Sequence, residues 1–185
     1  MTKTGATVEL LLGRGQVLEA ALDAGLAWRV ERGMLLIRSP ARRGERSWRL
    51  ALPGDWLNIE ALCGLPPDTQ TTALIPSRLQ ALPTLQPSAS NALLQRLVQQ
   101  QRRWADDMLA LRSGSVEHRI RHLLDLARRA TGGARGGALE PDMPVLRDIA
   151  ALVDAAPETA CRVLARLRPS RQSVRPAAMP LLACA

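Results

Sequence analysis

The sequence predicts an α+β protein of two domains, with short antiparallel strands in its amino-terminal half and helices in its carboxyl-terminal half. Apolar runs between residues 8 and 82 are short and are broken by glycine, proline and charge clusters, which is typical of a small antiparallel barrel or sandwich. No glycine or proline interrupts residues 92–111, and this predicts one long helix. Residues 146–167 have the outline of a helix-turn-helix, with apolar residues at helical spacing on both sides of a small-residue break.

Two alternating segments mark the expected strands most clearly. Residues 27–38 alternate, turn at Gly33 and continue as an apolar strand, and residues 47–52 alternate again. The basic loop 41–46 should join them as a hairpin tip. Residues 53–55 (Pro-Gly-Asp) then have the composition of a turn. Residues 57–65 are ambiguous and are compatible with a short helix.

The long helix carries apolar residues at alternating steps of three and four, as in a heptad seam with one polar position. The seam consists of Leu94, Leu97, Gln101, Trp104, Met108 and Leu111. It predicts a parallel dimer. The alternative is that the stripe packs on the β domain, and Leu93 and Val98 make it broad enough to do so.

The helix-turn-helix pattern places its second helix at Pro157. A proline suits the first turn of a helix, and Glu158 suits the positive end of the helix dipole. Asp154 stands where the turn often has glycine, and aspartate tolerates a left-handed backbone. An ordinary helical hairpin is the alternative. The five arginines that follow Glu158, with no acidic residue among them, favour a helix that binds a phosphate backbone.

The amino-acid composition narrows the class of binding partners. The net charge of +8 and the pI near 11.2 favour nucleic acid before a membrane. Phenylalanine and tyrosine are absent and four tryptophans are the only aromatic residues, which argues against recognition by base stacking and favours double-stranded DNA. No segment has the order of a signal peptide or the length of a membrane span, so we expect a cytoplasmic protein.

Composition also bears on the chemistry. The three cysteines Cys63, Cys161 and Cys184 are far apart and lack metal-ligand spacing, so neither a disulfide framework nor a metal site is expected. His118 and His122 stand one helical turn apart, but no cysteine lies near them in the sequence, and we do not expect them to form a metal site. No Ser/His/Asp group or carboxylate pair is visible, which argues against an enzyme.

Several of these motifs carry a family resemblance. They are the glycines Gly33 and Gly44 before strands, the stretch 53–57 (Pro-Gly-Asp-Trp-Leu) and the stretch 72–77 (Thr-Ala-Leu-Ile-Pro-Ser). With these motifs, the amino-terminal half of the chain resembles the cyclic-nucleotide-binding β-roll of the Crp/Fnr transcription regulators. The resemblance implies a sensor β-roll over 1–87 that is shortened at its amino terminus, a dimerisation helix over 88–112, and a winged helix-turn-helix over 113–185. Its first helix would cover 116–127 and its wing 169–176.

The same resemblance bears on the ligand. Family members that bind cyclic AMP hold the ribose and phosphate with a Gly-Glu pair and an arginine beside a small residue. In this chain Glu60 could stand in for the acid, but Gln70 and Thr71 stand where the arginine would be, which argues against cyclic AMP. The missing amino-terminal cysteine cluster argues against an iron–sulfur cluster. The cofactor therefore stays unassigned.

Residues 158–162 (Glu-Thr-Ala-Cys-Arg) resemble the recognition signature Glu-Thr-Val-Ser-Arg of the family. The resemblance assigns base contacts to Glu158, with a cytosine amino group, and to Arg162, with guanine, which are also standard major-groove pairings. A surface ion pair is the alternative for these two residues. The predicted DNA-binding set is Glu158, Thr159, Cys161, Arg162 and Arg166, with Cys161 in place of a serine that contacts DNA.

We therefore expect a homodimeric, sequence-specific transcription regulator that reads a palindromic site with the helix from about 157 to 167. Its expected partners are double-stranded DNA, a second copy of itself and RNA polymerase. The competing hypothesis is a signal-binding or protein-interaction module whose DNA-binding end has decayed. Asp154, Cys161 and the prolines of the wing segment favour the competing hypothesis, and the arginine surplus opposes it.

Overall fold

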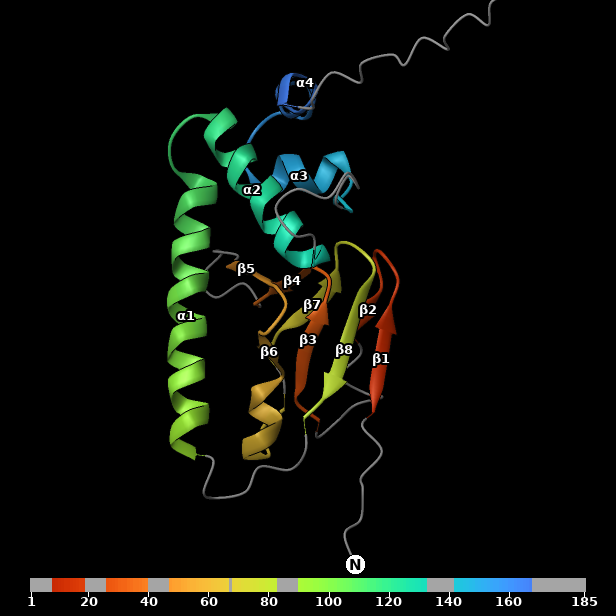
Figure 1. The fold of residues 1–185 in the computed structure, drawn as a ribbon, viewed down its shortest axis with the longest axis vertical. Coiled ribbons are helices and arrows are strands. Elements are labelled where there is room, and N and C mark those ends of the chain that lie inside the picture. The colour runs from red at the N-terminus through yellow and green to blue at the C-terminus, as the bar shows by residue number, and fades with distance from the viewer. Residues whose placement is uncertain are drawn as a thin grey trace, which may run out of the picture.

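The computed structural model describes residues 8–18, 26–39, 47–66, 68–82, 90–132 and 142–167. Within them, eight strands are followed by four α-helices, and Figure 1 shows their arrangement. The strands are β1 (Glu9–Leu12), β2 (Val17–Leu18), β3 (Trp28–Arg32), β4 (Leu35–Arg38), β5 (Trp48–Ala51), β6 (Trp56–Leu57), β7 (Gln70–Ala73) and β8 (Ser77–Ala81). The helices are the 3-10 helix η1 (Ile59–Cys63), α1 (Ser90–Arg112), α2 (Val116–Thr131), α3 (Leu146–Leu152) and α4 (Pro157–Leu167). The predicted hairpin tip at 41–46 and the predicted wing at 169–176 lie outside the described residues.

The strands form a β-roll of two antiparallel four-stranded sheets, which confirms the predicted fold class. One sheet has the order β1-β8-β3-β6 and the other the order β2-β7-β4-β5. The predicted pairing of 35–38 with 48–51 is the β4–β5 ladder, in which Leu35 lies opposite Ala51. The domain that the sequence predicts to be shortened thus still builds both sheets.

Gly33 carries the chain from β3 in one sheet to β4 in the other. Its φ is +115°, and a Cβ at this position would lie 2.6 Å from the Cα of Ser77. A backbone in this region favours glycine, and the close approach leaves no room for a side chain. The Gly33 N–H donates to the carbonyl of Ala130 in α2 at 2.8 Å. The same glycine therefore joins the two sheets and contacts the first helix of the carboxyl-terminal region.

The interior of the roll is filled with side chains from both sheets. Trp28, Val30 and Leu35 are at most 1% exposed, and Leu79 from β8 is fully buried beside them. Trp104 of α1 belongs to the same cluster and is 7% exposed. Helix α1 therefore covers the roll with a large aromatic side chain, as Figure 1 shows for the helix along one side of the sheets.

The predicted turn at 53–55 is the anchor for α1. The buried carboxylate of Asp55 accepts the Trp104 indole N–H at 3.1 Å and the Leu52 backbone N–H at 2.9 Å. Its other oxygen accepts from Arg103 at 2.7 Å. The buried Gln100 side chain accepts the backbone N–H of Trp56 and donates to the Trp56 carbonyl, at 2.8 and 2.9 Å. These contacts fix the rotation of α1 about its own axis.

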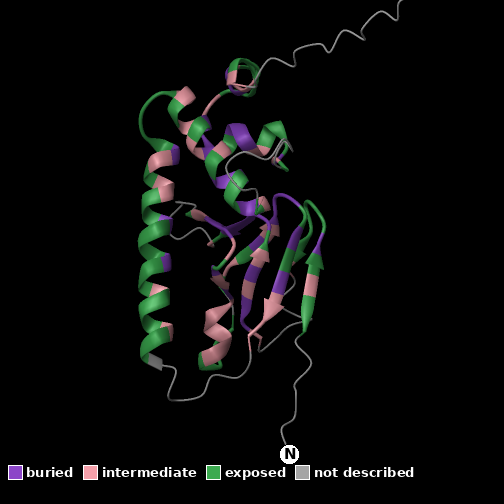
Figure 2. Cartoon of the chain, viewed as in Figure 1, coloured by how far each residue is buried: buried purple, intermediate pink, exposed green. Residues whose placement is uncertain are grey.

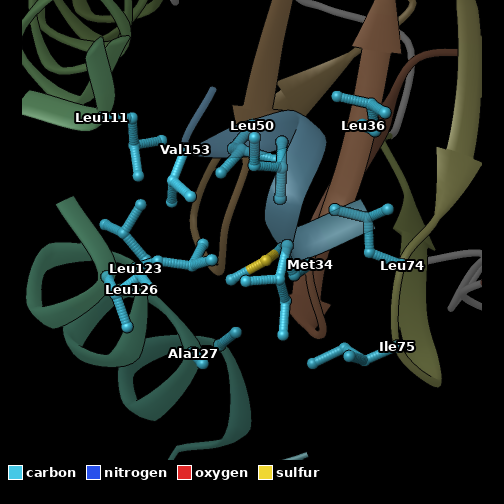
Figure 3. Packing of buried hydrophobic residues seen from close by; sticks show 14 of the residues in the cluster. Met34, Leu36, Leu50, Leu74, Ile75, Leu111, Leu123, Leu126, Ala127 and Val153 are labelled. Atoms are coloured by element: carbon cyan, nitrogen blue, oxygen red, sulfur yellow. The ribbon is translucent and has the colours of Figure 1, made fainter. Parts of the chain in front are cut away.

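The roll and the carboxyl-terminal helices share one hydrophobic core. Strand β4 is buried on both faces, which explains its continuous apolar run: Leu35 and Ile37 belong to the roll interior, and Leu36 belongs to the cluster under the helices. Figure 3 shows that cluster. It combines Met34, Leu36, Leu50, Leu74 and Ile75 of the roll with Leu111, Leu123, Leu126, Ala127 and Val153 of the helical part.

Helix α2 is the element that lies between the two parts. Its N-cap is Ser115, whose side chain accepts the His118 N–H, and it ends at Gly132 in a left-handed conformation. Figure 2 shows that buried residues concentrate in the sheets and where α2 and α3 meet the roll, whereas much of α1 is exposed. No helix in the described ranges is long and apolar enough to cross a membrane.

Candidate nucleic-acid interface

Helices α3 and α4 form the predicted helix-turn-helix. The buried faces of the two helices include Ile149 and Ala150 on α3 and Ala160 and Val163 on α4. Small side chains allow the helices to approach closely, and the Ala155 N–H in the turn donates to the Ala150 carbonyl at 3.0 Å. Figure 1 shows α4 at the end of the molecule that is remote from the sheets. This position leaves one side of α4 open.

Asp154 adopts the left-handed backbone that the sequence predicts, with a φ of 49°. The turn is held from outside by Arg119 of α2, whose Nη1 donates to the carbonyl of Val153 at 2.6 Å and to that of Asp154 at 3.2 Å. Arg112 of α1 lies 3.5 Å from the Asp154 carboxylate and stacks over Trp48, with 5.0 Å from Cζ to the ring centroid. These contacts connect α1, α2 and the turn.

The open side of α4 carries most of the predicted DNA-binding residues. Glu158, Arg162 and Arg166 recur at every fourth position and therefore share one face, and all three are exposed. Cys161 is exposed on the flank of this face, and Thr159 is half-buried at its edge. Among the described residues, Arg162 and Arg166 form no ion pair, so the alternative Glu158–Arg162 pair is not made. The face presents two guanidinium groups and one carboxylate to solvent.

The six residues of the predicted dimer seam are divided between two faces of α1. Trp104 and Leu111 are 7% and 0% exposed because they pack inside this chain, Trp104 on the roll and Leu111 beside α2. They are not available to a partner, and the packing alternative describes them correctly. Leu97 and Met108 are half-buried, whereas Leu94 is 61% exposed and Gln101 is exposed.

A different apolar stripe of α1 faces solvent. At about 100° of rotation per residue, Leu94, Val98 and Leu109 lie on one flank of the helix, with Gln101 and Ala105 between them. Leu94, Val98 and Leu109 are 61%, 44% and 66% exposed. Only Leu94 and Gln101 of this stripe belong to the predicted heptad seam, because heptad counting does not show which of two adjacent stripes the rest of the chain covers.

The other ligand candidates have ordinary partners in the described structure. His122 Nε2 lies 3.0 Å from Asp107 Oδ1, an acidic partner that is remote in sequence, and Arg129 lies 3.4 Å from the same oxygen. No group of three or more potential metal ligands occurs among the residues that the structure describes. Gln70 is exposed and Thr71 is buried on β7, and neither supplies a cation for a phosphate.

Comparison with solved structures identifies the fold. A CRP-family transcriptional regulator from Thermus thermophilus is similar with a TM-score of 0.62 and 24% identity over 86% of this chain and 84% of that chain. FixK2 from Bradyrhizobium japonicum has a TM-score of 0.61 and 20% identity over 88% and 84%. A CRP/FNR-family regulator, also from Thermus thermophilus, has a TM-score of 0.56 and 23% identity over 86% and 85%.

No family model matches the sequence, and no curated protein matches it. The similarity to the solved structures nevertheless extends over both parts of the chain, from the roll to the helix-turn-helix. The chain therefore has the fold of the CRP/FNR transcriptional regulators, as the sequence motifs indicate.

Proposed function

We propose that this protein is a transcriptional regulator of the CRP/FNR family that binds double-stranded DNA as a homodimer. The observation that carries the proposal is the solvent-facing side of α4, where Arg162 and Arg166 form no ion pair with a described residue. Unpaired guanidinium groups on an open helix of a helix-turn-helix are suited to a major groove and its phosphates. The fold supports the proposal because the similar structures include transcriptional regulators.

Within this proposal, Arg162 reads a guanine and Glu158 accepts a hydrogen bond from a cytosine amino group. The two side chains are four residues apart on one exposed face, so they reach neighbouring base pairs on the same side of the helix. Arg166, one turn further along, contacts a phosphate. Thr159 and Cys161 border the same surface, and the thiol is a weaker donor than the hydroxyl of the family signature.

The homodimer places two copies of α4 on one two-fold axis. The exposed stripe of Leu94, Val98 and Leu109 supplies an apolar surface along α1, and Gln101 provides its polar position. The opposite side of α1 is occupied by its contacts with Asp55 and Trp56. Dimerisation through the stripe thus leaves the roll contacts intact, and the two α4 helices enter successive major grooves about one DNA turn apart.

The experiment that tests DNA reading is selection of bound sites from a random duplex pool, followed by binding assays. We expect enriched palindromic sites whose half-site centres are about 10 base pairs apart. Arg162→Ala should lower affinity for the selected site by about 5- to 150-fold, which is the value of one bidentate base contact, while leaving salt-dependent binding to random duplex. Equal losses on selected and random duplexes would contradict the base contact.

Arg147→Ala is the matched control, because Arg147 lies on α3 and its side chain is 90% exposed. It removes the same charge from the helix-turn-helix without touching the reading face of α4. We expect this variant to bind the selected site and the random duplex slightly more weakly than the wild type, and to a similar extent for both. If no site is enriched at moderate salt, the protein-interaction module becomes the better account of this chain.

The dimer surface is tested separately by sedimentation equilibrium. Leu109→Glu places a charge on the exposed stripe and should convert the dimer to a monomer, because the partner helix would have to bury an unpaired carboxylate. Leu65→Glu is the control, since Leu65 is 58% exposed and follows η1 rather than belonging to α1. A dimer that withstands Leu109→Glu would refute the stripe as the interface.

A further inference from the structure

A polar groove lies beside α1, outside the interior of the roll. It has a volume of about 390 Å³ and is bounded by Gly54 of the turn after β5, by Trp56 of β6, and by Arg96, Gln99 and Arg103 of α1. This volume lies within the range of sites for small molecules, roughly 300–1,000 Å³. The groove therefore has the size of a small-molecule site. One of its walls comes from residues 53–56 and the other from α1, which are distant in sequence.

The lining of the groove is cationic. Arg96 forms no ion pair with any residue in the described ranges. Arg103 uses Nη2 to bind Asp55 at 2.7 Å, while its side chain remains 48% exposed. The described residues that line the groove include no acidic side chain. Guanidinium groups bind phosphate and carboxylate oxygens with strong, charge-assisted hydrogen bonds.

The walls of the groove are already ordered. Gln100 holds both the N–H and the carbonyl of Trp56, and Asp55 holds Arg103. A ligand would therefore meet a fixed turn and a fixed arginine, and it would lose less free energy in ordering them. The indole Nε1 of Trp56 is buried and has no hydrogen-bond partner in the described structure. Its environment makes this N–H a sensitive reporter of any change at the groove wall.

The groove is also separate from the surface assigned to dimerisation. At about 100° per residue, Arg96 and Arg103 lie on the flank of α1 opposite Leu94, Val98 and Leu109. A dimer formed through that stripe leaves the arginines exposed. The groove lies beside residues 96–103 of α1, whereas α4 lies beyond the end of α1 from which the chain continues into α2 (Figure 1).

We propose that this groove is a binding site for a small organic oxyanion, a phosphate ester or a carboxylate. Arg96 and Arg103 bind its charged oxygens, and the Gln99 amide is placed to bind a polar group of the same molecule. Bound there, the anion connects the turn at 53–56 with α1 from outside the roll. The residues of this site take no part in the proposed DNA reading, so a test of the site gives a result that does not depend on the proposed function.

The test follows the indole N–H resonances by NMR during titration with sodium phosphate, glucose 6-phosphate or succinate at constant ionic strength. The chain has four tryptophans, and the Trp56→Phe variant identifies the resonance of Trp56. We expect a saturable shift of this resonance with at least one probe. Phosphate and glucose 6-phosphate report phosphate recognition, and succinate reports carboxylate recognition. No saturable shift with any of the three probes would overturn the proposal.

Two variants of α1 make the test specific. Arg96→Gln removes the unpaired guanidinium of the groove and should raise Kd about tenfold or more, as expected for loss of one charge-assisted contact. Arg102→Gln removes an exposed arginine that does not line the groove, and it should leave Kd nearly unchanged. Equal weakening by both variants would show general charge attraction and would also overturn the site.

Discussion

Replacing Leu126 by alanine tests whether the roll and the helix-turn-helix unfold as one unit. Leu126 lies on α2, is 0% exposed and belongs to the cluster that contains Met34 and Leu36 of the roll. Truncating such a leucine costs about 2–5 kcal/mol in transfer free energy and cavity formation. For a chain of this size that loss lowers Tm by about 4–20 °C.

Two optical probes separate the parts of the molecule. All four tryptophans occur at or before position 104, so their fluorescence follows the roll and α1, whereas far-ultraviolet circular dichroism follows mainly the helices. In the wild type and in Leu126→Ala the two melting curves should coincide, since the shared core makes unfolding cooperative. If Leu126→Ala lowers the melting temperature seen by circular dichroism but not the one seen by fluorescence, the shared core is refuted.

Leu65→Ala is the matched control for this experiment. Leu65 is 58% exposed, and exposed substitutions of this kind change stability by less than about 0.5 kcal/mol. Both melting curves should therefore remain at their wild-type positions.

Substitutions at three further positions test individual contacts by urea unfolding. Gly33→Ala should lose at least about 1–3 kcal/mol, because a φ of +115° strains any side chain and Ser77 leaves no space; an unchanged midpoint would refute the close approach. Asp55→Ala should cost more than about 2 kcal/mol, because it leaves the buried N–H groups of Leu52 and Trp104 without an acceptor, and a neutral result would count against the anchor for α1. Asp154→Val should lower the free energy of unfolding by about 1–3 kcal/mol, because a φ of 49° strains a β-branched residue. Asp154→Gly should leave the stability near that of the wild type. Equal effects of the two substitutions would contradict the strained turn.

Local patterns in the sequence predict much of this fold. The α4 start at Pro157 and the left-handed Asp154 depend on residue types whose backbone preferences are strong. The uninterrupted segment 92–111 lies inside α1, which spans Ser90–Arg112. Such features are local, so a short window of sequence contains their cause. The edge strands β1 and β2, with four and two residues, are too short for periodicity to identify.

The contacts that position the site depend on residues far apart in the chain. Trp104 occupies a heptad position, but its indole is held by Asp55, which lies 49 residues earlier. Arg119 contributes to the basic charge of the chain, yet it holds the carbonyls of Val153 and Asp154. Periodicity and net charge carry no information on such pairings. The sequence therefore predicts the exposed face of α4 better than it predicts which arginines lack an ion pair and which apolar residues of α1 face solvent.

The most direct test of the proposed DNA reading is base-by-base binding on a selected site. Every base pair of one half-site is replaced in turn, and Kd is measured for the wild type and for Arg162→Ala. We expect the wild type to discriminate at each contacted position by about 1–3 kcal/mol, and Arg162→Ala to lose discrimination only at one G·C pair. If Arg162→Ala discriminates like the wild type at every position, or loses discrimination equally at all positions, base reading by α4 is contradicted.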